Sequence, residues 1–277
     1  LLTADENIKR RVMKESLDLL AQNTDLKKEP SAYITEVHRI LKRICGIEVP
    51  FEHRRRRCNE LGLELGRNLE SQIEHLGGFD RFSLLARWSI AGNALDFRTV
   101  GAGYDFDMEA LQRSLYDLVN RLEVDQLPQI YEKITPAKKI LFIHDNVGEI
   151  ALDKLLIKDI QRFSKASIIS AVRGGPITSD ATIADAEQVN LREASASVIL
   201  AGPDTLGISF EEMSGELRAE LSRTDLVIAK GQANYYVLSE HKDGVNCPIV
   251  CLFRTKCQLV SGMFNHAADS INVAAIL

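Results

Sequence analysis

The sequence has 277 residues, of which 45% are hydrophobic and 26% charged, and a net charge of −5 at pH 7. This length supports one large domain or two ordinary ones with a sizeable hydrophobic core. The acidic balance gives no electrostatic reason to expect a nucleic-acid partner, and no apolar run is long enough to cross a membrane. Five cysteines are an odd count in a long chain, so we expect buried free thiols and a reducing, cytoplasmic location.

Residues 1 to about 125 are predicted to form a helical unit. Apolar side chains recur there at spacings of three and four residues, which is the pattern of amphipathic helices. No convincing strand pattern is found in this half. Helices are expected at Asn7–Gln22, between the breaks at Pro30 and Gly46, at Phe51–Leu76, Phe79–Ile90 and Asp107–Arg121, followed by a short one at Gln126–Glu132.

The one basic run, His53 to Arg57, lies within the third predicted helix. Such a run can bind phosphate, but the acidic Glu60 and Glu64 follow it on the same helix. Nearby charges of opposite sign favour a solvated or salt-bridged helix face. We therefore leave this run out of the candidate site.

From Lys139 onward the pattern changes to alternating strands and helices. Strands rich in Ile, Val and Leu with helices between them predict a mostly parallel sheet covered on both faces. The fold class is therefore α/β, with a helical unit at 1–125 and an α/β/α Rossmann-like unit at 126–277. The strands are expected at Ile140–His144, Ser167–Val172, Ser197–Ala201, Leu226–Ala229 and Ile249–Phe253, and the helices at Ile150–Phe163, Thr182–Val189, Phe210–Leu221 and Asn234–Ser239.

The segment Lys139–Glu149 contains the clearest candidate site. An apolar run of strand length ends in Asp145 and Asn146, and the chain then turns through Gly148 into a helix. In open α/β sheets, ligands bind at the carboxyl ends of the strands. A single Asp or Asn would suffice to cap the helix. Two adjacent oxygen donors followed by Glu149 favour a ligand site instead.

Other strands end in polar or tightly turned segments that would share this edge. Carboxylate and amide oxygens from Asp145, Asn146 and Asp180 favour magnesium or manganese over zinc. Asp180 has a second interpretation, as a helix cap near Thr182. Lys230 would neutralise phosphate charge, and Gly231 beside it would let backbone N–H groups approach.

Two further candidates for binding the substrate lie in the same part of the chain. Ser209 precedes Phe210 and is predicted to cap a helix, whose start can also bind an anion. Asn234 follows Lys230 and Gly231 after the fourth predicted strand.

Asn93 and Asp96 form a candidate pair in the helical unit. They are three residues apart, so on a helix they would share one face. A buried or cleft-facing pair and an Asn at a helix end with an unrelated surface Asp are equally compatible with this spacing. The nearby Gly101–Gly103 segment lacks the G-x-G-x-x-G spacing and follows no strand, so it does not indicate a dinucleotide site.

Taken together, these segments resemble the damage-control phosphatases, a family once catalogued as a domain of unknown function and related to proteins described as acidic-residue methyltransferases. The resemblance covers roughly residues 80 to 260. It rests on Asp145-Asn146-x-Gly148-Glu149, Ser179-Asp180-Ala181-Thr182, the stretch from Asp225 to Asn234 that contains Lys230-Gly231-Gln232, Gly92-Asn93 with Asp96, and Lys256-Cys257.

The resemblance implies a helical domain packed on a Rossmann-like domain and metal-dependent hydrolysis of small phosphorylated metabolites, often damaged or surplus sugar phosphates. The metal ligands it implies are Asp145, Asn146 and Asp180, with Mg²⁺, Mn²⁺, Co²⁺ or Ni²⁺ as the cofactor. Lys230 and Asn93 carry over as phosphate or substrate contacts. Small prokaryotic members often open with a Cys-x-x-Cys segment, whereas this sequence starts at Leu1 in its first predicted helix, so the branch of the family stays open.

Three functions remain compatible with the sequence. A metal-dependent phosphomonoesterase is favoured, with either water or an aspartate as the nucleophile. A carboxyl methyltransferase that uses S-adenosylmethionine would need a cofactor cradle, and no Gly-x-Gly-x-Gly turn follows the first strand. A non-catalytic nucleotide or sugar-phosphate binding protein could use the same edge. The oligomeric state is left open.

Overall fold

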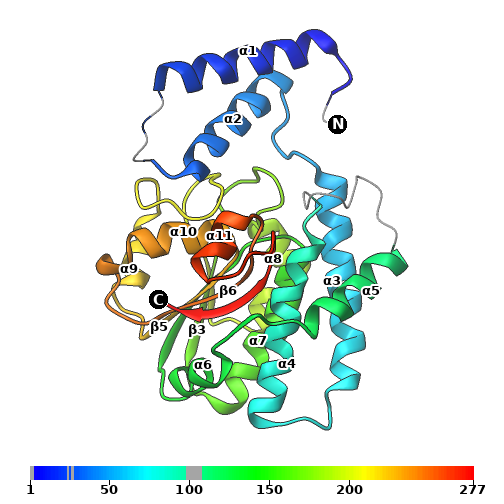
Figure 1. Ribbon diagram of the computed structural model, residues 1–277, viewed down its shortest axis with the longest axis vertical. Helices are drawn as coiled ribbons and strands as arrows, with labels where there is room; N and C mark the ends of the chain where they lie inside the picture. The colour runs from blue at the N-terminus through cyan, green and yellow to red at the C-terminus, as the bar shows by residue number, and fades with distance from the viewer. Residues whose placement is uncertain (1–2, 24, 26–27, 98–107) are drawn as a thin grey trace.

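The computed structural model describes residues 3–23, 25, 28–97 and 108–277 (Figure 1). The Gly101–Gly103 segment and Asp107, the expected first residue of a helix, lie outside the described residues. In the described part, helices precede a sheet whose faces are both covered by helices, as Figure 1 shows. The predicted α/β class is confirmed.

The predicted helices of the first half are all present in the described residues. Pro30 occupies the first turn of the second helix, and Gly46 ends that helix in the left-handed conformation, with φ of +64°. The helices are α1 (Glu6–Asn23), α2 (Pro30–Cys45), α3 (Glu52–Gln72), α4 (Gly78–Ala91), the 3-10 turn η1 (Gly92–Leu95), α5 (Met108–Val119) and α6 (Leu127–Ile134).

Helices α1 and α2 form a hairpin that stands apart from the sheet at the top of Figure 1. Ion pairs join α2 to the segment that follows the fourth strand. Arg39 Nε lies 3.0 Å from Asp204 Oδ1 and Arg39 Nη2 lies 2.9 Å from Glu212 Oε2, while Lys42 Nζ lies 2.7 Å from Asp204 Oδ2. The hairpin is thereby tied to loops on the carboxyl side of the sheet.

The sheet contains seven strands in the order β1-β7-β6-β5-β2-β3-β4. All neighbouring strands are parallel except β6 and β7, which are antiparallel. The carboxyl ends of β2, β3 and β5 therefore meet at one edge, as the sequence predicts. The strands are β1 (Val124–Asp125), β2 (Lys139–Ile143), β3 (Ser167–Val172), β4 (Ser197–Leu200), β5 (Leu226–Lys230), β6 (Ile249–Arg254) and β7 (Asn272–Ile276).

One predicted helix of the second half begins later than expected. The predicted cap, Ser209, is in a turn where its Oγ accepts from Glu212 N at 3.2 Å. Ser214 is the actual N-cap, because its Oγ accepts from Leu217 N at 2.9 Å. The prediction of a helix that starts at Phe210 is therefore wrong. The helices of this half are α7 (Glu149–Phe163), α8 (Ile183–Gln188), α9 (Gly215–Leu221), α10 (Gln232–Glu240) and α11 (Gln258–Met263), with 3-10 turns η2 (Leu191–Glu193) and η3 (Lys242–Gly244).

Strands β1 and β7 and helix α11 were not predicted. Strand β1 is only two residues long, and β7 contains two alanines, a residue type that is depleted in strands. Strand β1 joins the sheet by pairing with β7, and β7 pairs with β1 on one side and with β6 on the other.

Two hydrophobic clusters lie on opposite faces of the sheet, because successive side chains of a strand point to opposite sides. On one face, alternate residues of β2 such as Ile140 and Phe142 pack with α3, α4 and α7. On the other face, Leu141 and Ile143 pack with α9 and α10. Helices α3 and α4 thus share a core with the sheet, and the division at residue 125 stays a prediction.

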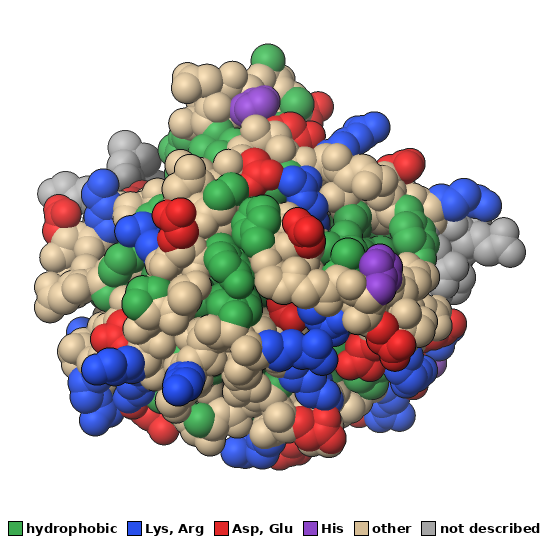
Figure 2. Space-filling view, turned by 90° about the horizontal axis from the view of Figure 1, so that it is seen from below, with side chains coloured by type: hydrophobic (Ala, Val, Ile, Leu, Met, Phe, Trp, Pro, Cys, Tyr) green, Lys and Arg blue, Asp and Glu red, His purple; other side chains and the backbone are tan. Residues whose placement is uncertain are grey.

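Three further expectations concern the surface charge, membrane-spanning helices and the cysteines. Acidic and basic side chains are interspersed over the face in Figure 2, with hydrophobic side chains between them. In the described part of the chain, no helix has the length and apolar character required to span a membrane. All five cysteines are free, and Cys58 and Cys251 are buried.

Candidate active site

Two loops at the carboxyl edge of the sheet bring the predicted metal ligands together. One loop follows β2 and carries Asp145 and Asn146, and the other follows β3 and carries Asp180. Backbone hydrogen bonds join them, because Ala181 N donates to Asp145 O at 2.7 Å and Val147 N donates to Ser179 O at 2.8 Å. These bonds form an isolated antiparallel bridge between Asn146 and Asp180.

The three side chains are almost entirely buried, with exposed fractions of 5% for Asp145, 1% for Asn146 and 0% for Asp180. Asn146 Nδ2 donates to Asp145 Oδ2 at 2.6 Å, and Asn146 Oδ1 accepts from Ser179 Oγ at 2.8 Å. Asp180 Oδ1 accepts from Gly207 N at 3.2 Å. The candidate ligands are thus held in place by neighbouring protein groups.

The donor set suits a hard divalent cation. Within the described residues no group of three or more His, Cys, Asp or Glu side chains is arranged to hold a metal. The candidate ligands Asp145, Asn146 and Asp180 are not such a group, because they comprise two carboxylates and one amide. A half-turn of the Asn146 amide would place its carbonyl oxygen beside Asp145 and its NH₂ group beside Ser179 Oγ. Carboxylate and amide oxygens are the ligands that Mg²⁺ and Mn²⁺ prefer.

The helical half of the chain supplies two side chains to this region. Asn93, in η1, is 2% exposed, and its Nδ2 lies 3.4 Å from Asp145 Oδ2 and 3.2 Å from Glu149 Oε2. Asp96 is fully buried and forms an ion pair with Lys256, whose Nζ lies 2.9 Å from Asp96 Oδ2. Asn93 therefore faces the candidate ligands directly, whereas Asp96 pairs with a partly exposed lysine that follows β6.

Lys230 lies in a fully buried ionic cluster. Its ammonium contacts Glu149 Oε1, lies 3.1 Å from Asp153 Oδ1 and donates to Ser89 O at 2.9 Å. An ammonium has three donors, so these contacts use them all. Its predicted contact with phosphate stays a prediction, while the geometry connects Lys230 to the candidate ligands through Glu149. Glu149 Oε2 accepts from Asn146 Nδ2 at 3.2 Å.

The cluster continues away from the ligands through Asp153. Asp153 Oδ1 accepts from Ser89 Oγ at 2.6 Å, and Asp153 Oδ2 lies 2.9 Å from His144 Nδ1. Burial acts to raise the pKa of Asp153, but Lys230 and the hydrogen bond with His144 outweigh it, so the pKa is lowered. Burial acts to lower the pKa of Lys230, but Asp153 and Glu149 outweigh it, so the pKa is raised. Each member of this pair therefore favours the charged form of the other.

The pKa values of Asp145 and Glu149 are shifted in the opposite direction from that of Asp153. Burial, followed by repulsion from Glu149, raises the pKa of Asp145 to about 7, against attraction from Lys256 and Arg173. Burial also raises the pKa of Glu149, although Lys230 opposes this shift. A bound dication would favour the charged forms of such carboxyl groups. The local charge balance is therefore compatible with a cation site.

Gly231 is required by the packing of Asp145. Its φ is +84°, and a Cβ atom placed on it would lie 2.0 Å from Asp145 Oδ2. The predicted approach of the Gly231 backbone to phosphate is not tested. The structure shows instead that this backbone lies close to the candidate metal ligand Asp145.

Gly231→Ala should displace the Asp145 carboxylate and strain the backbone. We expect Mn²⁺ affinity to fall roughly 10–100-fold, and the free energy of unfolding to fall by more than about 1 kcal/mol. Calorimetric titration with Mn²⁺ and urea unfolding measure the two effects. Gly215→Ala is the control, because a Cβ there meets nothing within 4 Å. Wild-type Mn²⁺ binding by Gly231→Ala would show that Asp145 is not a ligand.

Asn234 and Ser209 lie in different surroundings from each other. Asn234 Oδ1 accepts from Arg173 Nη2 and Ile208 N, both at 2.8 Å, and its Nδ2 donates to Lys230 O at 2.7 Å and His144 O at 3.3 Å. The protein thus uses the full hydrogen-bonding capacity of this amide. Ser209 lines a small pocket with residues of α2. Their predicted substrate contacts remain untested.

Arg173 is the main residue of this region that the sequence analysis did not select. Its side chain is fully buried after β3, and its Nε lies 3.9 Å from Asp180 Oδ1. Among the described residues, Arg173 Nε and Nη1 make no hydrogen bond. Its position at a strand end, equivalent to that of Asp145 after β2, was the available signal in the sequence.

The fold and the site define a class of protein: a Rossmann-like α/β protein with a candidate oxygen-ligand site at the carboxyl edge of its sheet. The damage-control phosphatase ARMT1-like domain matches residues 2–271. The chain therefore belongs to this family, as its sequence motifs indicate.

Similar proteins come from several archaea. A damage-control phosphatase of Archaeoglobus fulgidus is 32% identical over 266 residues, covering 94% of this chain and 88% of that protein. An uncharacterised protein of Methanocaldococcus jannaschii is 32% identical over 269 residues, covering 94% of this chain and 84% of that protein. The crystal structure of a DUF89 family protein from Pyrococcus horikoshii has a TM-score of 0.85 and 28% identity, covering 99% of this chain and 91% of that chain.

Proposed function

We propose that this protein is a metal-dependent phosphatase that hydrolyses phosphomonoesters of small metabolites such as sugar phosphates. The observation that carries the proposal is the junction of the two loops, which gathers Asp145, Asn146 and Asp180 at the sheet edge. The name of the related phosphatase from Archaeoglobus fulgidus supports the reaction class.

Each residue has a separate role in this proposal. Asp145, Asn146 and Asp180 hold a divalent cation, with Mg²⁺, Mn²⁺, Co²⁺ and Ni²⁺ as candidates. The cation would polarise a phosphoryl oxygen and stabilise its charge. Asn93 binds the phosphate or the organic part of the substrate. Lys230 acts through Glu149, which it holds against Asn93 and Asn146.

The test is phosphate release from p-nitrophenyl phosphate and from a panel of sugar phosphates, using protein treated with EDTA and then supplied with Mg²⁺, Mn²⁺, Co²⁺ or Ni²⁺. We expect release only when a metal is added. Release at full rate in EDTA would contradict metal dependence. Absence of release from every substrate, with binding of sugar phosphates retained, would favour a non-catalytic binding protein.

A further inference from the structure

We infer that Arg55 and Asn59 of α3 are positioning residues that clamp the two ligand-bearing loops to each other. Their relation to metal binding rests on the proposed function, whereas the clamp itself rests on contacts between protein groups alone. The two residues are four positions apart, so they lie on the same face of α3, one turn from each other. Both are buried, with exposed fractions of 3% for Arg55 and 0% for Asn59.

Asn59 holds the loop that follows β2. Its Oδ1 accepts from Gly148 N at 2.8 Å, just after the Asp145–Asn146 pair and at the start of α7. Helix α3 comes very close to this loop, because a Cβ atom on Gly148 would lie 2.8 Å from Cys58 O. The Asn59 amide therefore contacts the peptide that carries the chain from the candidate ligands into α7.

Arg55 holds the loop that follows β3. Its Nη2 donates to Asp180 O at 2.8 Å, and its Nη1 donates to Thr178 O. These carbonyl groups flank Ser179 and include the backbone of the candidate ligand Asp180. A buried guanidinium with several fixed acceptors leaves this loop few alternative positions.

Asp185 joins the two halves of the clamp. Asn59 Nδ2 donates to Asp185 Oδ1 at 3.0 Å, and Arg55 Nη2 contacts Asp185 Oδ2. The same carboxylate accepts from Thr182 N at 2.9 Å, in the capping box of α8. One carboxylate thus links both α3 side chains to the segment that follows Asp180.

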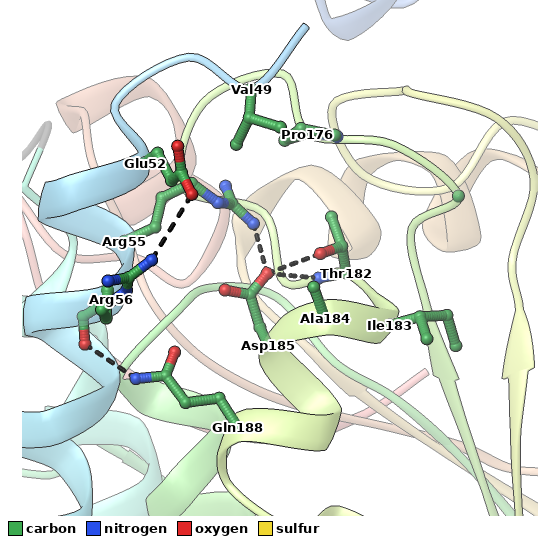
Figure 3. A pocket seen from close by; sticks show the side chains of 11 residues that line it. Val49, Glu52, Arg55, Arg56, Pro176, Thr182, Ile183, Ala184, Asp185 and Gln188 are labelled. Carbon is green, nitrogen blue, oxygen red and sulfur yellow. Dashed lines mark hydrogen bonds and ion pairs between the residues drawn. The ribbon is translucent and has the colours of Figure 1, made fainter.

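A cavity of about 530 Å³ borders the clamp on its outer side, as Figure 3 shows. There Arg55 points inward to Asp185, whereas the Arg56 side chain points to Glu52 and the Arg56 backbone carbonyl accepts from Gln188 Nε2 at 3.1 Å. The basic run was expected to be solvated or salt-bridged: Arg56 and Arg57 are exposed and pair with Glu52 and Glu60, whereas Arg55 is buried and pairs with Asp185. The rotation of α3 turns that one arginine toward the loops.

The experiment compares Arg55→Lys, Asn59→Ser and the control Arg56→Lys by amide hydrogen exchange in the metal-free protein. Lysine keeps the charge but lacks the planar fork, and serine is too short to reach both loops. We expect exchange to become at least about tenfold faster in both 145–150 and 178–185 in either clamp variant, because each residue supports the junction. Arg56→Lys should exchange as wild type does.

Mn²⁺ titration of the same proteins, without substrate, is the second measurement. We expect affinity to fall roughly 10–100-fold in the clamp variants and to stay unchanged in Arg56→Lys. Wild-type exchange in both loops of a folded Arg55→Lys or Asn59→Ser protein would overturn the clamp, as would loosening confined to one loop. Faster exchange with unchanged Mn²⁺ affinity would overturn its role in metal positioning. A wild-type protein that releases no phosphate would refute the proposed function but leave the exchange result valid.

Discussion

Asp145→Asn should abolish metal-stimulated phosphate release while the protein remains folded. The change removes the carboxylate proposed as a metal ligand but keeps the shape of the side chain against Gly231. Loss of the several kcal/mol that a metal ion contributes to charge stabilisation corresponds to a roughly 10³-fold fall in turnover. Because burial and Glu149 already disfavour the charged form of Asp145, the neutral amide should not destabilise the metal-free protein. Turnover with saturating Mn²⁺ and thermal unfolding without metal test these two expectations.

Asp243→Asn is a matched control for this prediction. Asp243 lies in the exposed 3-10 turn η3, where the same chemical change removes a surface charge. We expect it to leave both turnover and metal affinity as they are in the wild type. Full metal-dependent turnover by Asp145→Asn would refute the ligand assignment.

Lys230→Met should lower the free energy of unfolding by about 3–5 kcal/mol, the typical effect of removing one partner of a buried ion pair. The reason is that Glu149 and Asp153 would keep their buried carboxyl groups without the cation that both contact. Phosphate release should fall as well, because Glu149 would lose the contact that holds it beside Asn146. Urea unfolding, monitored by circular dichroism, measures the change in the free energy of unfolding.

A second variant separates the ionic cluster from a direct contact with phosphate. Combining Lys230→Met with Glu149→Gln and Asp153→Asn removes all three charges, so much of the lost stability should return. If Lys230 instead bound phosphate directly, Lys230→Met alone would reduce activity and leave the unfolding curve unchanged. That result would replace the indirect role proposed for Lys230.

The sheet edge could be predicted from sequence because each strand and the polar residues after it lie in one short, continuous segment of the chain. The apolar run before Asp145 gave strand β2, and the strand–helix alternation implied parallel strands with their carboxyl ends together. That topology brings the loops after β2 and β3 to one edge, and the backbone bonds between the loops then place Asp180 beside Asp145 and Asn146. Asn93 and Asp96 were selected by their spacing, and both are buried, with Asn93 beside Asp145.

The remaining features depend on contacts between segments distant in sequence. Ser209 and Ser214 are both plausible helix caps, but Ser214 is also fixed by donating to Leu200 O, at the end of β4, at 2.6 Å. The partners of Lys230 could not be predicted, because they come from α4 and α7 after packing. Arg55 is indistinguishable from its basic neighbours until α3 is docked, since the rotation of a helix decides which side chain is buried.

Strand β7 is the last of the seven strands to be synthesised, yet it lies between β1 and β6. Until its residues leave the ribosome, β1 has no partner and the outer edge of β6 stays open. The sheet can therefore assemble from β6 through β4 during translation, but its final closure must follow the synthesis of Asn272–Ile276. An unpaired strand edge is a template for pairing with another chain. A nascent chain halted just before Asn272 would thus present the open edge of β6 for pairing with another chain.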